Sequence, residues 1–127
     1  MSTSIRTYGF QPEDDTPVEG KFVQLRWQGQ DQLLFATREA HRFHNEIVAQ
    51  FLTEQGAARA HADAEDTFTD VPGLEIVGGG RFRLDRSAGR LEVWDASSVY
   101  GRFDADRLPA LLAAAGPPWS ELTLEIR

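Results

Sequence analysis

The sequence predicts an α/β fold of the α+β kind, with two helices flanking one mixed sheet of about six strands. Several short segments alternate apolar and polar residues, which is typical of half-buried strands. Two other segments repeat apolar residues every three or four positions, as amphipathic helices do. The length of 127 residues, with 41% hydrophobic and 26% charged residues, suits a single globular domain. We expect an extended N-terminal arm over residues 1–18 and one domain over residues 19–127.

The expected arm is polar, and two prolines and an acidic run at residues 13–15 oppose regular structure in it. It can supply an edge segment of the sheet near residues 5–8. Residues 21–27 then alternate in polarity, and residues 32–36 are apolar on both faces, so the two segments predict a hairpin. Lys21 is the only lysine among 13 basic residues and stands at the first position of the expected strand. We expect its ammonium group to reach past the end of the sheet into a cleft or into water.

The start of the first helix is ambiguous in the sequence. Phe43, Ile47 and Phe51 lie four residues apart and predict a helix that begins near Phe43, whereas Thr37 could cap a helix that begins earlier. A start near Phe43 would place His44 and the following backbone amides at the helix N-terminus, where free N–H groups favour anions. A start at Thr37 would place His44 in mid-helix.

The second half of the chain predicts one more hairpin, a helix and a closing strand. Residues 57–70 are expected to form an exposed insertion, and residues 74–77 a strand that Gly78, Gly79 and Gly80 interrupt. Residues 81–85 and 90–96 form a hairpin in which Arg83 faces Glu92 and Arg81 faces Trp94, so that an ion pair and a stacked pair are expected. A small polar loop follows over residues 96–101. Apolar residues at 108, 111, 112 and 115, with Asp106 as the expected cap, predict the second helix, and residues 122–126 alternate as a final strand.

Composition excludes several classes of site. The chain has no cysteine, which removes thiolate catalysis, disulfides and zinc sites built on thiolates. The net charge of −7 argues against nucleic-acid binding. No apolar window approaches a membrane span, and the N-terminus lacks the apolar core of a secretion signal, so we expect a cytoplasmic protein with no membrane association. His41 and His44 are three residues apart, but no carboxylate pattern supports a metal site, and we expect neither a metal nor a cofactor.

The residues that remain suit an oxyanion. A histidine, a lysine, a glycine-rich segment followed by arginine and a loop of small residues could together hold a phosphoryl group, if the fold brings them together. These residues are His44, Lys21, Arg81 after Gly78–Gly80, and Ser97, Ser98 and Val99.

Four segments resemble motifs of the Janus family, which includes the protein histidine phosphatases (phosphohistidine phosphatases). They are residues 21–26 (KFVQLR), 43–47 (FHNEI), 78–82 (GGGRF) and 93–101 (VWDASSVYG), in the family's order. The resemblance covers about residues 19–126 and implies a mixed sheet flanked by two helices. It implies that His44 matches the catalytic histidine, Lys21 the phosphate-contacting lysine and Arg81 the arginine after the glycines. It further implies that Asn45 matches an amide donor, and that the loop at Ser97, Ser98 and Val99 cradles the phosphate. Glu46 places a carboxylate close to His44.

The function expected from this resemblance is metal-independent hydrolysis of phosphohistidine, a phosphoramidate, in proteins or peptides. The histidine would act as a general base or as a transient nucleophile, and the sequence leaves the two roles open. The alternative is a phosphate- or phosphopeptide-binding module on the same fold that has lost turnover. The expected partner is a phosphorylated protein or peptide, and we expect a monomer.

Overall fold

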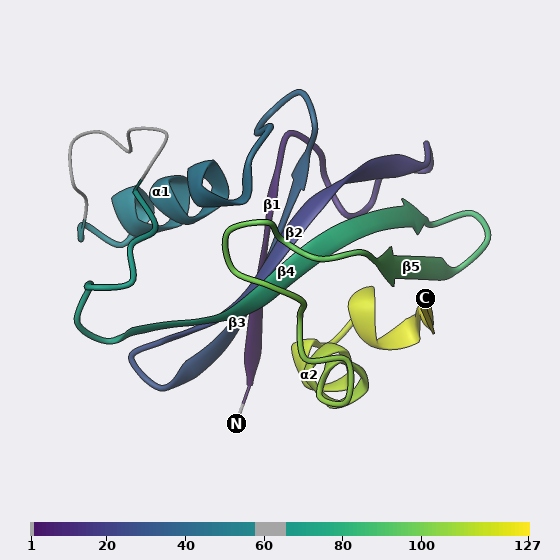
Figure 1. Ribbon diagram of the computed structural model, residues 1–127. Coiled ribbons are helices and arrows are strands. Elements are labelled where there is room, and N and C mark those ends of the chain that lie inside the picture. The colour runs from purple at the N-terminus through teal and green to yellow at the C-terminus, as the bar shows by residue number, and fades with distance from the viewer. Residues whose placement is uncertain (1, 58–65) are drawn as a thin grey trace.

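Six strands form one mixed sheet in the order β1-β3-β2-β4-β5-β6, and two helices pack against it (Figure 1). The computed structural model describes residues 2–57 and 66–127 of this small α+β domain. The elements are β1 (Thr3–Tyr8), β2 (Val18–Trp27), β3 (Gln30–Thr37), α1 (His44–Glu54), β4 (Leu74–Asp85), β5 (Arg90–Trp94), α2 (Leu108–Ala115), a 3₁₀ turn (Trp119–Glu121) and β6 (Thr123–Ile126). None of the described helices is long and apolar enough to cross a membrane.

The two predicted hairpins are confirmed, since β2 pairs antiparallel with β3 and β4 pairs antiparallel with β5. Strands β2 and β4 also pair antiparallel and form the centre of the sheet. Two parallel pairings complete it, β1 with β3 and β5 with β6. Strand β1 therefore takes residues 3–8 of the expected arm into one edge of the sheet. Strand β2 begins at Val18, so Lys21 lies inside the strand and the expected strand start at Lys21 was wrong.

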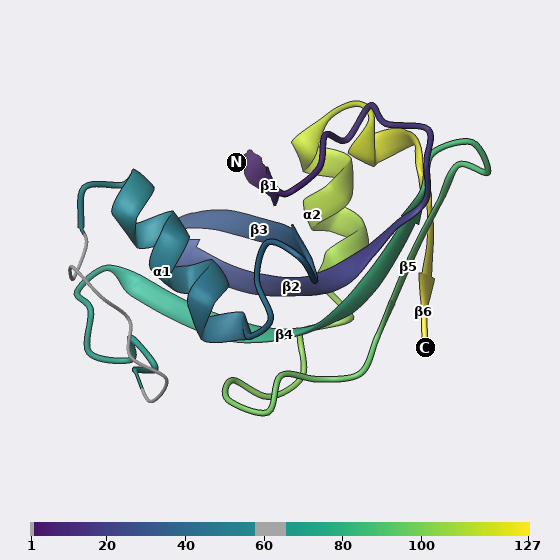
Figure 2. The same ribbon diagram turned by 90° about the horizontal axis from the view of Figure 1, so that it is seen from above.

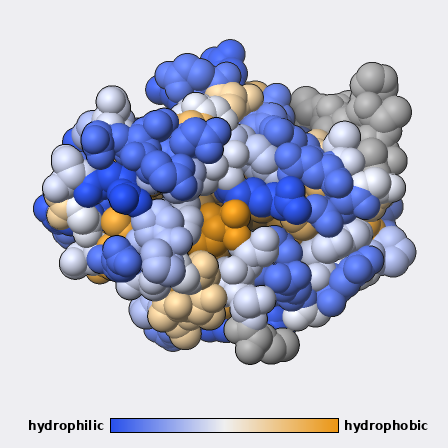
Figure 3. Space-filling model, turned by 180° about the vertical axis from the view of Figure 1, so that it is seen from behind, coloured by the Kyte–Doolittle hydropathy of each residue, from blue (hydrophilic) through white to orange (hydrophobic). Residues whose placement is uncertain are grey.

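The two helices cover opposite faces of the sheet and enclose two apolar clusters (Figure 2). Side chains of α2 pack against the face that carries Phe22, Phe35 and Phe82. Side chains of α1 pack against the opposite face, which carries Val23 and Leu34, because successive residues of a strand point to opposite faces. On the side shown in Figure 3, hydrophilic side chains surround small hydrophobic areas.

Strand β4 runs without a break through Gly78, Gly79 and Gly80, so the predicted interruption there was wrong. The glycines permit close contacts instead. A Cβ atom on Gly78 would lie 2.3 Å from the carbonyl oxygen of Arg102, and one on Gly80 would lie 2.6 Å from that of Trp94. These glycines therefore mark the places where other segments cross the strand closely.

Helix α1 begins at His44, with Phe43 as its N-cap residue, which settles the ambiguity of the sequence in favour of the later start. The carboxylate of Glu46 accepts hydrogen bonds from the backbone N–H groups of Arg42 (2.9 Å) and Phe43 (3.1 Å) and fixes the turn into the helix. Helix α2 begins after Arg107, so the predicted cap at Asp106 was wrong.

The predicted register of the β4–β5 hairpin is confirmed, with Arg81 opposite Trp94 and Arg83 opposite Glu92. The side chains nevertheless have other partners. Arg83 pairs with Glu19 of β2 at 3.3 Å. The guanidinium group of Arg127 lies over the indole of Trp94 in place of Arg81.

The expected insertion at residues 57–70 falls largely outside the described residues. Of its described part, Phe68 is only 2% exposed and belongs to the apolar cluster under α1. The expectation of full exposure was therefore wrong at this position.

Candidate active site

The imidazole of His44 lies in the first turn of α1 and is 5% exposed. Its Nε2 atom lies 3.0 Å from the carbonyl oxygen of Gly80 on β4. A carbonyl oxygen only accepts hydrogen bonds, so Nε2 carries the proton and the neutral ring keeps its lone pair on Nδ1. A Cβ atom on Gly79 would lie 2.8 Å from Cδ2 of this ring. The glycine-rich strand thus leaves the space that the imidazole occupies.

The pKa of His44 is lowered from its usual value of 6.5, chiefly because burial disfavours the charged imidazolium. The bond to Gly80 opposes this change, while the positive charges of Lys21 and Arg81 add to it and the negative charge of Asp95 opposes it. The imidazole is therefore predominantly neutral at pH 7, the form that can accept a proton or attack an electrophile.

Lys21 of β2 and Arg81 of β4 are direct cross-strand neighbours at the centre of the sheet. Two like charges in this position repel each other, and the arrangement favours an anion between them. The ammonium group of Lys21 also lies 5.7 Å from the centre of the Phe43 ring. Burial lowers the pKa of Lys21, and the charges of Arg81 and Arg38 lower it further. Among the described residues Lys21 has no carboxylate in ion-pair contact.

The loop after β5 approaches the same glycine segment from the other side. The backbone N–H of Gly79 donates to the carbonyl oxygen of Gly101 at 3.0 Å, which ties the loop to β4. Within the loop, the hydroxyl oxygen of Ser97 accepts the N–H groups of Val99 (3.2 Å) and Tyr100 (3.0 Å). The hydroxyl proton of Ser97 stays available for donation, although the side chain is only 3% exposed.

The other two sequence-predicted loop residues, Ser98 and Val99, are exposed. The side chain of Asn45 is buried and donates to the carbonyl oxygen of Asp66 at 3.1 Å, so this amide group holds the last part of the expected insertion. The structure thus gathers His44, Lys21 and Arg81 around β4, with the Ser97 loop on the same strand. The side-chain amide of Asn45 instead bonds the backbone at Asp66.

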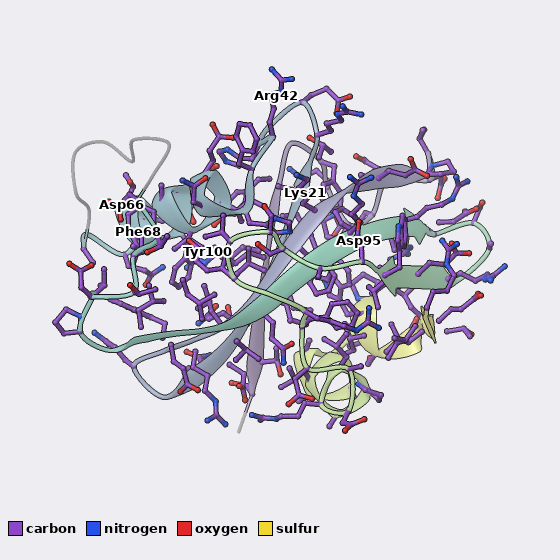
Figure 4. The ribbon with its side chains drawn as sticks, viewed as in Figure 1. Lys21, Arg42, Asp66, Phe68, Asp95 and Tyr100 are labelled. Atoms are coloured by element: carbon purple, nitrogen blue, oxygen red, sulfur yellow. The ribbon has the colours of Figure 1, made fainter. Side chains whose placement is uncertain are left out.

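A cleft of about 1020 Å³ opens beside this group; Lys21 and Arg81 line it together with Phe43, whereas His44 and Ser97 lie behind its lining. Its other walls come from residues 14–20, from the β3–α1 loop with Arg38 and Arg42, and from Trp94. In Figure 4, Lys21 lies below Arg42 and to the upper left of Asp95, whereas Tyr100 lies farther left, below α1, and Asp66 and Phe68 lie near the other end of that helix.

The sequence analysis did not assign three charged residues to the site. Arg38 and Arg42 line the cleft, and Asp95 pairs with Arg81. The two arginines precede α1 and had no periodicity to mark them, and the predicted strand at residues 90–96 placed Asp95 inside β5. Strand β5 ends at Trp94, so Asp95 belongs to the loop.

Metal ligands do not gather in the described part of the chain, where no group of three or more histidine or acidic side chains could hold an ion. His41 hydrogen-bonds Gln50 of α1. His61 lies outside the described residues.

The chain matches no protein-family model, and no curated protein matches it in sequence.

Proposed function

We propose that the chain is a metal-independent phosphohistidine phosphatase of the Janus kind, acting on phosphorylated proteins or peptides. One observation carries the proposal: a buried neutral imidazole, anchored through Nε2, lies beside two cations that face each other across β2 and β4. A phosphoryl group placed among them would have its oxygens held by Lys21 and Arg81 and its phosphorus next to Nδ1 of His44.

The reaction converts phosphohistidine and water into histidine and inorganic phosphate. In one route Nδ1 of His44 takes a proton from water, the water oxygen attacks phosphorus, and the P–N bond to the substrate histidine breaks as the departing ring nitrogen takes up the proton from Nδ1. In the other, Nδ1 attacks phosphorus directly and the P–N bond to the substrate histidine breaks; water then attacks the phosphorus and breaks its bond to Nδ1, which releases phosphate and restores His44. Both routes use the same atom, and both need the neutral ring that the lowered pKa of His44 supplies.

Two exposed apolar side chains support a peptide or protein as the carrier of the phosphoryl group. Phe43 is 58% exposed and directly precedes His44, and Val99 is 45% exposed in the Ser97 loop. Exposed apolar side chains that adjoin residues of a polar site in the chain suit contacts with the residues that flank a phosphohistidine.

The direct test is turnover of a phosphohistidine peptide by the His44→Ala variant. We expect a loss of roughly a hundredfold or more, as for removal of an acid–base or nucleophilic group. His41→Ala is the matched control, because His41 lies three residues earlier and its ring contacts Gln50 and Tyr8 rather than residues of the site. Turnover that is unchanged in His44→Ala, or equally reduced in both variants, would contradict the proposal.

A phosphate-binding module without turnover is the second candidate. The observation that favours it is the ion pair between Arg81 and Asp95, because an arginine held by a carboxylate is less available to a transition state. Binding of a phosphohistidine peptide without release of phosphate would select this function, and release of phosphate would exclude it.

A further inference from the structure

Asp95 has an unusual backbone conformation. It is the first residue after β5, and its φ angle of 67° lies in the left-handed region, which glycine, asparagine and aspartate adopt most readily. Its Oδ1 atom accepts the backbone N–H of Ala96 at 2.9 Å, a local bond that supports this turn. The conformation directs the carboxylate back toward β4.

The other carboxylate oxygen of Asp95 lies 3.2 Å from Nε of Arg81. The two side chains are 49% and 56% exposed, so water reaches the contact and the pair can exchange partners. Among the described residues, Asp95 is the one carboxylate that pairs with either cation of the site.

The negative charge of Asp95 also acts on the rest of the site. It favours the protonated forms of both Lys21 and His44, against the burial that lowers their pKa values. Glu46 acts on Lys21 in the same direction, but Asp95 is the carboxylate that also acts on His44 and is in direct contact with Arg81. This is the place and the charge that a bound phosphoryl group would take.

We propose that Asp95 acts as a built-in competitor for the anion site, which a phosphoryl group must displace from Arg81 in order to bind. The inference rests on the proposed function, since it concerns the same site. It makes Asp95 a specificity-determining residue: the carboxylate lowers the affinity for every anion, including the product phosphate. A dianionic phosphoryl group displaces it more readily than a singly charged ligand does.

Asp95→Asn isolates the charge. Asparagine also adopts the left-handed conformation, and its Oδ1 can still accept the Ala96 amide, so the turn is kept while the ion pair is lost. The dissociation constant of inorganic phosphate, measured by NMR titration of backbone amides at low salt, should fall about threefold to fivefold, the range for loss of an exposed charge contact. Glu125→Gln is the matched control, because it removes the same charge from an exposed arginine pair on β6.

Arg81→Gln completes the test. If Asp95 competes through Arg81, then Asp95→Asn should tighten phosphate binding by less than about twofold in the Arg81→Gln background. Equal tightening by Asp95→Asn and Glu125→Gln would overturn the inference in favour of a general charge effect, and so would unchanged or weaker binding by Asp95→Asn. Wild-type binding with no gain in Asp95→Asn would overturn the inference and leave the proposed function intact. If no variant binds phosphate, both fail.

Discussion

The same strands present alternate side chains to the two faces of the sheet, and the two faces differ in how far they are covered. The face under α2 is closed by apolar packing, in which Phe35 stacks on Trp119 with ring centres 4.8 Å apart. The face under α1 is apolar only beneath the helix. Beyond the N-terminus of α1 the same face carries Lys21 and Arg81, which line an open cleft. The site therefore lies where the packing of α1 ends, and the helix that completes the core also places His44.

The largest expected effect is a loss of stability, and two variants compare it between the two faces. Phe35→Ala and Phe51→Ala each remove a buried ring, 1% and 0% exposed, and each should lower the free energy of unfolding by about 3–5 kcal/mol in urea titrations. Phe51 lies in α1, two turns after His44, so only its replacement should also weaken phosphate binding by the folded protein. Equal weakening by both variants would show that the two faces do not act separately.

Gly79→Ala adds a single methyl group but should disturb the position of the His44 ring. The added Cβ would lie 2.6 Å from the carbonyl oxygen of Phe22 and 2.8 Å from Cδ2 of His44, so backbone or ring must move. We expect a loss of stability of about 1–3 kcal/mol, as for overpacking, and a marked fall in turnover of a phosphohistidine peptide. Turnover equal to that of the wild type would mean that the ring does not need this space.

The local pattern of the sequence was enough to predict the hairpins and the β4–β5 register, because alternation and short turns fix which residues face each other. It also indicated an edge segment near residues 5–8, but not the partner of that segment, and it was wrong for the glycines. The parallel pairing of β1 with β3 joins segments more than twenty residues apart, and no local signal encodes it. Three consecutive glycines are as compatible with a turn as with a strand. Only the segments that lie close against Gly78–Gly80 in the structure explain why these residues continue the strand.

The candidate site was likewise predicted only in part, because local sequence patterns identify residue types and motifs but not the contacts between distant segments. His44, Lys21 and Arg81 were named from residue type and motif, and the fold brings them together around β4. The partners of those residues depended on contacts between distant segments. The carboxylate of Glu46, expected to act near the histidine, caps the helix instead, and Asp95 is the carboxylate that pairs with Arg81.

Removal of the charge on Lys21 should have an intermediate effect. Lys21→Met keeps the aliphatic chain but removes the cation, and phosphate binding should weaken about tenfold, the range for a hydrogen bond to a charged group. Arg86→Met, in the turn between β4 and β5, removes the same charge outside the cleft and should leave the dissociation constant unchanged. An equal loss in both variants would assign the effect to net charge.

The smallest expected effect is the pH dependence of stability that His44 causes. Its pKa in the folded protein lies below 6.5, so the unfolded chain binds the proton more readily. The neutral ring of His44 therefore contributes to the stability of the folded protein. This contribution is fully present above pH 6.5 and is lost as the pH falls through the lowered pKa. The free energy of unfolding of the wild type should therefore decrease relative to that of His44→Asn below about pH 6.5. Parallel curves for the two proteins would indicate an unshifted histidine.

The comparison between the two faces can be tested most directly by titrating inorganic phosphate into the wild-type protein and following the backbone amides by NMR. The proposed site predicts saturable shifts at His44 and Ser97 and around Arg81, while Leu111 and Trp119 on the α2 face stay unchanged. Absent shifts at both His44 and Ser97, or shifts concentrated on the α2 face, would contradict the central claim that the open half of the α1 face binds a phosphoryl group.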